Sequence, residues 1–71
     1  MTTEVKAELV GSVWKIVSKV GDSVAEEDVF LILESMKMEI PVAAPRAGTV
    51  KEIRVKEGEV VKEGQVLVVL D

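Results

Sequence analysis

The sequence repeats itself with an offset of 37 residues. The segment GSVWKIVSKVGDSVAEEDVFLILE, which starts at Gly11, aligns without a gap on GTVKEIRVKEGEVVKEGQVLVVLD, which starts at Gly48. Nine of the 24 aligned positions are identical, and others are conservative, such as Asp22 with Glu59. A chain of 71 residues that holds two copies of one motif has room for one small hydrophobic core. We therefore expect residues 1–71 to form a single domain with approximate two-fold symmetry.

Each copy reads as short strands separated by turns. In the second copy, Val50, Ile53 and Val55 have charged neighbours, a turn around Gly58 follows, and VLVVL has the pattern of a buried strand. The stretches EVKAELV and EIPVAAP, in which Ala7 and Ala44 are again 37 residues apart, add one further strand to each copy. No segment carries the long apolar stripe of an amphipathic helix. The sequence predicts an all-β fold, a flattened barrel or sandwich in which two four-stranded antiparallel sheets pack together.

The core must be aliphatic, because hydrophobic residues make up 48% of the chain but include only one Trp, one Phe and no Tyr. Such β-branched and aliphatic residues favour strands. We expect the core at matching positions of the two copies: Val13, Ile16, Val24, Val29, Leu31 and Leu33 from the first, and Val50, Ile53, Val61, Val66, Val68 and Leu70 from the second.

The composition excludes several kinds of site. Without Cys and His, the chain has no disulfide, no thiol nucleophile, and no imidazole to act as a base or zinc ligand. The clustered acids of EEDVF lack the spacing of an EF-hand, so we expect no metal site. The sequence also offers no nucleophilic side chain with a general base to activate it, which argues against an enzyme in its own right.

Charge and hydropathy limit the partners. Nine basic against thirteen acidic residues give a net charge of −4, which disfavours nucleic acid or an anionic membrane surface as the main partner. The longest apolar runs are VFLIL and VLVVL, far shorter than a membrane span, and the N-terminus does not resemble a secretory signal. We expect a soluble, cytoplasmic protein that is a monomer in isolation.

The segment SMKMEI connects the two copies and is the least ordinary part of the sequence. Between VFLILE and EIPVAA only SMKM remains, so the connection itself can be about two or three residues long, which predicts a β-hairpin. The connection nevertheless lacks Gly, Asn and Asp, the residues that tight turns prefer. Instead it places Lys37 between Met36 and Met38. Side chains alternate along a strand, so both methionines cannot reach the core, and an exposed methionine beside an amine suggests a tip that another protein contacts.

At this point the sequence resembles the biotinyl domains, the biotin carboxyl carrier modules of biotin-dependent carboxylases. ESMKMEI is similar to their usual motif, Glu-Ala-Met-Lys-Met, with Ser35 in place of the common alanine. The resemblance extends to the internal repeat, to the Gly-Asp turn and to the later RAGTV, and so covers nearly the whole chain. The gap-free repeat leaves no insertion for the protruding thumb loop of some bacterial carriers. The initiator Met and the compact fit favour a free-standing carrier over a fragment of a larger enzyme.

The resemblance implies a function and a set of partners. It implies that Lys37, flanked by Met36 and Met38, carries covalent biotin through an amide to its ε-amine. A biotin protein ligase would attach the biotin, and the arm would carry carboxyl groups between biotin carboxylase and carboxyltransferase subunits that act on an acyl-CoA or a 2-oxo acid. The carrier itself would catalyse neither half-reaction.

Two alternatives remain open from the sequence. A lipoyl carrier domain shares the fold and the modified lysine, but lipoyl lysines are typically flanked by Asp and a small residue. An unmodified barrel-sandwich module with a structural or interaction role would need no lysine at the tip. The Met-Lys-Met centre argues against both.

Overall fold

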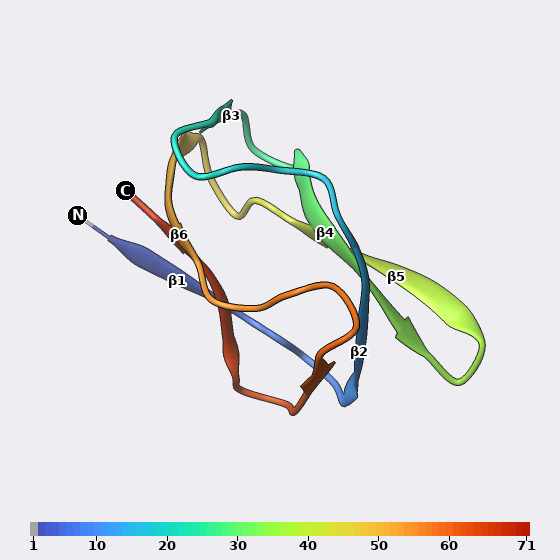
Figure 1. Ribbon diagram of the computed structural model, residues 1–71. Helices are drawn as coiled ribbons and strands as arrows, with labels where there is room; N and C mark the ends of the chain where they lie inside the picture. Colours follow the sequence, from blue (N-terminus) through green and yellow to red (C-terminus); the bar gives the residue numbers. More distant parts are fainter. Residues whose placement is uncertain (1) are drawn as a thin grey trace.

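The computed structural model describes residues 2–71, which form eight β-strands and no helix (Figure 1). The strands are β1 (Thr3–Lys6), β2 (Gly11–Ile16), β3 (Ser23–Val24), β4 (Val29–Ser35), β5 (Met38–Ala43), β6 (Gly48–Ile53), β7 (Val60–Val61) and β8 (Val66–Leu70). Each of the two antiparallel sheets has four strands. The predicted all-β architecture is confirmed.

The two sheets are related by the sequence repeat. One sheet has the order β1-β8-β6-β3 and the other β5-β4-β2-β7. Each strand of one sheet therefore has its equivalent in the other sheet four strand numbers away: β1 with β5, β8 with β4, β6 with β2, and β3 with β7. The copies do not form one sheet each, because every sheet takes two strands from each copy. The connection between the copies explains this interleaving: β4 and β5 are joined by a tight hairpin, so the last strand of the first copy must pair with the first strand of the second.

Bulges occur at equivalent places in the two copies. Trp14 is the extra residue of β2 against β4, and Lys51, 37 residues later, is the extra residue of β6 against β8. Phe30 in β4 and Leu67 in β8 form a second equivalent pair. A bulge interrupts the strict alternation of a strand, which lets consecutive residues face the same side.

The core agrees with most of the predicted positions. Eight of the twelve predicted residues are buried, namely Val13, Val24, Leu31, Leu33, Val50, Val61, Val68 and Leu70. Ile16, Ile53 and Val66 are partly buried. The prediction for Val29 is wrong: its side chain is 38% exposed, because the bulge at Phe30 turns Phe30 and Leu31 both inward. The core also contains residues that the pattern did not predict: Val5, Ala7, Phe30, Ala44, Val55 and Leu67.

The molecule is elongated, with Cα extents of 32 × 17 × 17 Å. The hairpin of β4 and β5 extends from the body at one end, whereas β1 begins and β8 ends at the other (Figure 1). Whatever the hairpin carries is therefore presented away from the ends of the chain.

Candidate functional site

The connection between the two copies is a two-residue β-turn. Ser35 pairs with Met38 across the hairpin, which leaves Met36 and Lys37 as the turn residues. Both turn residues have positive φ, 52° for Met36 and 65° for Lys37. Positive φ at both central positions is the type I′ pattern, which matches the twist of the flanking strands and normally uses Asn and Gly.

Met and Lys adopt this backbone at a cost. The left-handed region brings Cβ close to the following carbonyl oxygen, which costs about 1–2 kcal/mol for each residue that is not glycine. Two adjacent non-glycine residues hold this conformation in the hairpin, at Met36 and Lys37. Such strain is typical of functional positions, because selection for stability alone would replace it.

The side chains of the turn are directed to solvent. Lys37 is exposed, Met36 is 89% exposed and Met38 is 58% exposed. Within residues 2–71, the amine of Lys37 has no hydrogen-bond or ion-pair partner. Nothing in this part of the chain therefore competes with an acyl group for the Lys37 amine.

The base of the hairpin is fastened to the neighbouring loop. Ser35 Oγ donates a hydrogen bond to the carbonyl oxygen of Val10 at 2.9 Å. Gly11 allows the same close approach, since a Cβ at this position would lie 2.8 Å from the carbonyl oxygen of Glu34. The motif shows Ser35 only as a replacement for the common alanine and does not reveal this contact, because its acceptor lies 25 residues away in the chain.

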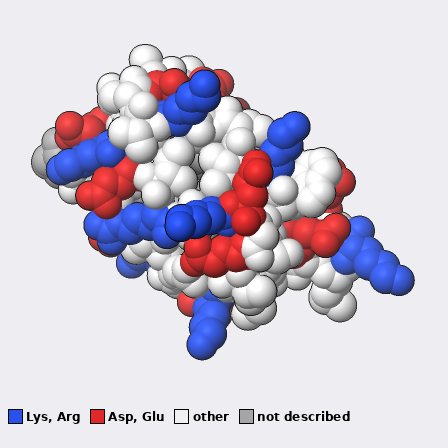
Figure 2. All heavy atoms as spheres, viewed as in Figure 1, with Lys and Arg blue, Asp and Glu red and all other residues white. Residues whose placement is uncertain are grey.

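The tip is flanked by an acidic pair. Glu34 and Glu39 lie directly opposite each other in the register of β4 and β5, and both are exposed. Acidic and basic side chains both reach the surface at this projecting end of the molecule (Figure 2). Directly opposed like charges destabilise a pair of strands, so the pair offers no advantage to the fold itself.

A hollow elsewhere on the described surface does not involve the tip. A hollow of about 290 Å³ lies between the edge strands β1 and β5, where Val5, Leu33 and Ile40 contribute to its lining, and none of residues 36–38 does. Across residues 2–71, three or more His, Cys, Asp or Glu side chains nowhere gather in a way that could hold a metal ion. The same residues include no helix that is long and apolar enough to cross a membrane.

Comparisons with known proteins agree with this geometry. A family model described as "Biotin-requiring enzyme" matches residues 1–70. The chain is 48% identical over 66 residues to the biotin/lipoyl attachment protein of Bacillus subtilis, an alignment that covers 93% of this chain and 90% of that one. It is 44% identical over 70 residues to the "Biotinylated protein TB7.3 homolog" of Mycobacterium leprae, with 99% of each chain covered.

A solved structure shares the fold closely. The urea carboxylase of Kluyveromyces lactis superposes with a TM-score of 0.95 at 35% sequence identity, over all of this chain and 6% of that one. A motif of Met, Lys and Met on a strained hairpin, a pseudo-symmetric pair of sheets and the matched family model all point the same way. The chain belongs to the biotin/lipoyl attachment family.

Proposed function

We propose that this protein is a biotin carboxyl carrier in which Lys37 is the site of biotin attachment. The observation that carries the proposal is the position of Lys37: it occupies the second residue of a strained two-residue turn, with an exposed amine that has no partner within residues 2–71. Related proteins are named for biotin attachment, which supports the same function.

Biotin is favoured over lipoate as the attached group. One relative is named for attachment of both, so that name does not separate the two groups. The residues beside the lysine do separate them, because Met36 and Met38 match the biotinyl motif and lipoyl lysines are typically flanked by Asp and a small residue. The lipoyl carrier is therefore the alternative that the experiment must test.

The chemistry requires little of the chain itself. A biotin protein ligase would supply a biotinyl carboxylate activated by a leaving group. The Lys37 nitrogen would attack the acyl carbon, the new C–N bond would replace the bond to the leaving group, and the amine would lose a proton. The ligase would have to assist that proton loss, because only the deprotonated amine is a nucleophile. This chain supplies position, since the paired strands β4 and β5 hold the amine out at the tip.

Once attached, biotin would supply the group that accepts and donates the carboxyl in a biotin-dependent carboxylase acting on an acyl-CoA or a 2-oxo acid. Lys37 lies in the turn of the projecting β4–β5 hairpin, which would let its flexible stem reach sites on two different subunits. The body of the domain would act as a rigid mount, and it would catalyse neither the carboxylation of biotin nor the transfer.

Intact-mass measurement after coexpression with a biotin protein ligase and biotin tests this function. We expect one biotinyl increment on the wild-type chain and none on Lys37→Ala. Lys56→Ala is the matched control, because Lys56 is also exposed in a loop and should leave the increment unchanged. An unmodified wild-type chain would overturn the proposal, and a lipoyl increment from a lipoyl ligase would support the alternative.

A further inference from the structure

The outer surface of one sheet is unusually apolar. Six residues on the outer side of the sheet β5-β4-β2-β7, or directly after β2, form what we call the apolar face: Trp14, Val17, Val29, Ile32, Pro41 and Val60. The exposed Lys15 lies beside it as the partner of Ile32 in β2. Trp14 and Val17 are each 49% exposed, and Val60 is 69% exposed. Their strand neighbours, such as Val13, Leu33 and Val61, are buried on the inner side. Ile32 and Pro41 are direct cross-strand partners, which makes the surface continuous over β4 and β5.

The internal repeat provides a control for this surface. The residues 37 positions away, on the outer side of the other sheet, are Lys51, Arg54, Val66, Val69, Glu4 and Ser23. Four of these six are charged or polar, and Val69 is only 5% exposed.

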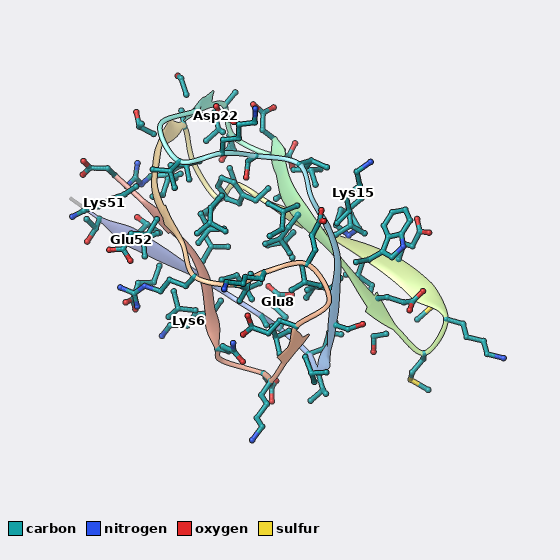
Figure 3. The ribbon with its side chains drawn as sticks, viewed as in Figure 1. Lys6, Glu8, Lys15, Asp22, Lys51 and Glu52 are labelled. Carbon is teal, nitrogen blue, oxygen red and sulfur yellow. The ribbon has the colours of Figure 1, made fainter. Side chains whose placement is uncertain are left out.

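The outer side of the other sheet, which we call the charged face, also holds an ion pair. Arg54 Nε donates to the Glu52 carboxylate at 2.9 Å, and this contact raises the pKa of the guanidinium. In the stick view, Lys51 and Glu52 project from β6 on one side of the molecule, while Lys15 projects from β2 on the other (Figure 3). The same backbone thus tolerates polar residues at these positions, so the fold does not explain the apolar face.

The apolar face lies on the strands that carry the candidate attachment site. Ile32 is five residues before Lys37 in the chain, so the two are at most about 16 Å apart, the length of five extended residues. A typical specific interface covers about 800 Å² of each partner, a round patch of about 16 Å radius. An enzyme centred on Lys37 with an ordinary interface would therefore reach Ile32 and the bulge at Trp14, which lies between the β2 partners of Leu33 and Ile32.

We propose that the apolar face is a second contact surface for the biotin protein ligase, with Trp14 as its anchor. This inference rests on the proposed attachment of biotin at Lys37. The complementary ligase surface would have an apolar hollow for the indole and, nearer the tip, basic groups that face Glu34 and Glu39. Large aromatic side chains in desolvated pockets commonly dominate binding energy, which is why Trp14 is assigned this role rather than the valines.

The length of the arm distinguishes the ligase from the carboxylase subunits. Before modification, the reacting atom is only a four-carbon stem away from the backbone, so the ligase must bring its active site up to the sheet. After modification, the acyl chain of biotin lengthens the arm, and a carboxylase site can act from further away. Loss of the apolar face should therefore impair biotinylation more than it impairs carboxylation.

The experiment compares equivalent substitutions on the two faces. Trp14→Lys introduces the residue that the second copy has at the same bulge, so the backbone is known to accept it. Lys51→Ala on the charged face is the matched control. We expect kcat/KM for biotinylation to fall about tenfold or more for Trp14→Lys, through KM, and to stay unchanged for Lys51→Ala. Binding of unmodifiable Lys37→Ala chains to the ligase, with and without Trp14→Lys, should show the same loss.

Each outcome decides the inference. If Trp14→Lys is biotinylated and bound like the wild type, the inference is overturned while attachment at Lys37 still stands. If the wild type is never biotinylated, both fall together. If sedimentation shows a wild-type dimer that Trp14→Lys dissociates and biotinylation is unaffected, a second copy covers the face and the ligase does not. Thermal unfolding confirms that each variant is folded, and Trp14→Ala replaces Trp14→Lys if the latter is not.

Discussion

Glu27 and Gly64 occupy equivalent positions in the two copies and share one backbone conformation. The φ angle is 72° for Glu27 and 85° for Gly64. The amide of Glu27 donates to the carbonyl of Ala44 at 2.8 Å, and the amide of Gly64 donates to the carbonyl of Ala7 at the same distance. Ala7 and Ala44 are themselves 37 residues apart, so the two loops are copies in their hydrogen bonds as well as in their dihedral angles. Only the second copy has the residue type that adopts this conformation without strain.

We predict opposite effects of exchanging the residue types at these two positions. Glu27→Gly should raise the free energy of unfolding by about 1 kcal/mol, because glycine removes the left-handed strain. Gly64→Ala should lower the free energy of unfolding by about the same amount. The cause would be backbone strain and not a steric clash, since a Cβ there would meet no atom within 4 Å. Urea unfolding followed by circular dichroism measures both, and a stabilised Gly64→Ala variant would contradict the shared conformation.

The turn that carries Lys37 should also trade stability for function. The double substitution Met36→Asn and Lys37→Gly introduces the preferred type I′ residues, and should raise the free energy of unfolding by about 1–2 kcal/mol. It also removes the attachment residue. Met36→Asn alone keeps Lys37 and should gain part of the stability while it slows biotinylation. A double variant no more stable than the wild type, measured by urea unfolding, would show that the turn is not strained.

The sequence predicted this turn better than it predicted the sheets. The repeat ends at Glu34, and that alone indicates a short connection at Met36 and Lys37. The interleaving of the copies was not visible, because strand patterns do not say which strands pair. Phe30 and Leu67 were missed for a local reason: period-two alternation places neighbours on opposite faces, and a bulge at each position breaks it.

Substitutions of Phe30 test how much the inward-facing residue of that bulge contributes to stability. Its side chain is fully buried, and its equivalent in the second copy is the fully buried Leu67. Phe30→Ala should cost about 3–5 kcal/mol, a large part of the total stability of so small a domain. Phe30→Leu, which copies the second half of the chain, should cost only about 1 kcal/mol. Equal losses for the two variants in urea unfolding would show that Phe30 fills no specific space.

Gly11 and Gly48 should resist substitution because neighbouring backbone approaches them closely. Both glycines begin strands, β2 and β6. A Cβ at Gly48 would lie 2.7 Å from the carbonyl oxygen of Asp71, and one at Gly11 would lie 2.8 Å from that of Glu34. Each alanine variant should therefore lose about 1–3 kcal/mol in chemical denaturation. Only Gly11→Ala should also slow biotinylation, since Glu34 belongs to the hairpin, and equal rates for the two variants would contradict this.

Met36 and Met38 should matter to partners and hardly at all to folding. Both are mostly exposed, so replacing both with leucine removes little buried surface, and leucine at position 36 meets the same positive φ as methionine. The melting temperature should therefore change by an amount that corresponds to about 0.5 kcal/mol or less. The rate of biotinylation should fall, because unbranched methionine adapts to a contacting surface in ways that leucine cannot.

The control for this prediction is Leu33→Ala, at a buried position in the same hairpin. Loss of packing there should lower the free energy of unfolding by about 2–5 kcal/mol. A double leucine variant that melts as early as this control would mean that the methionines support the fold, and the tip would then lack the exposed contact surface assigned to it.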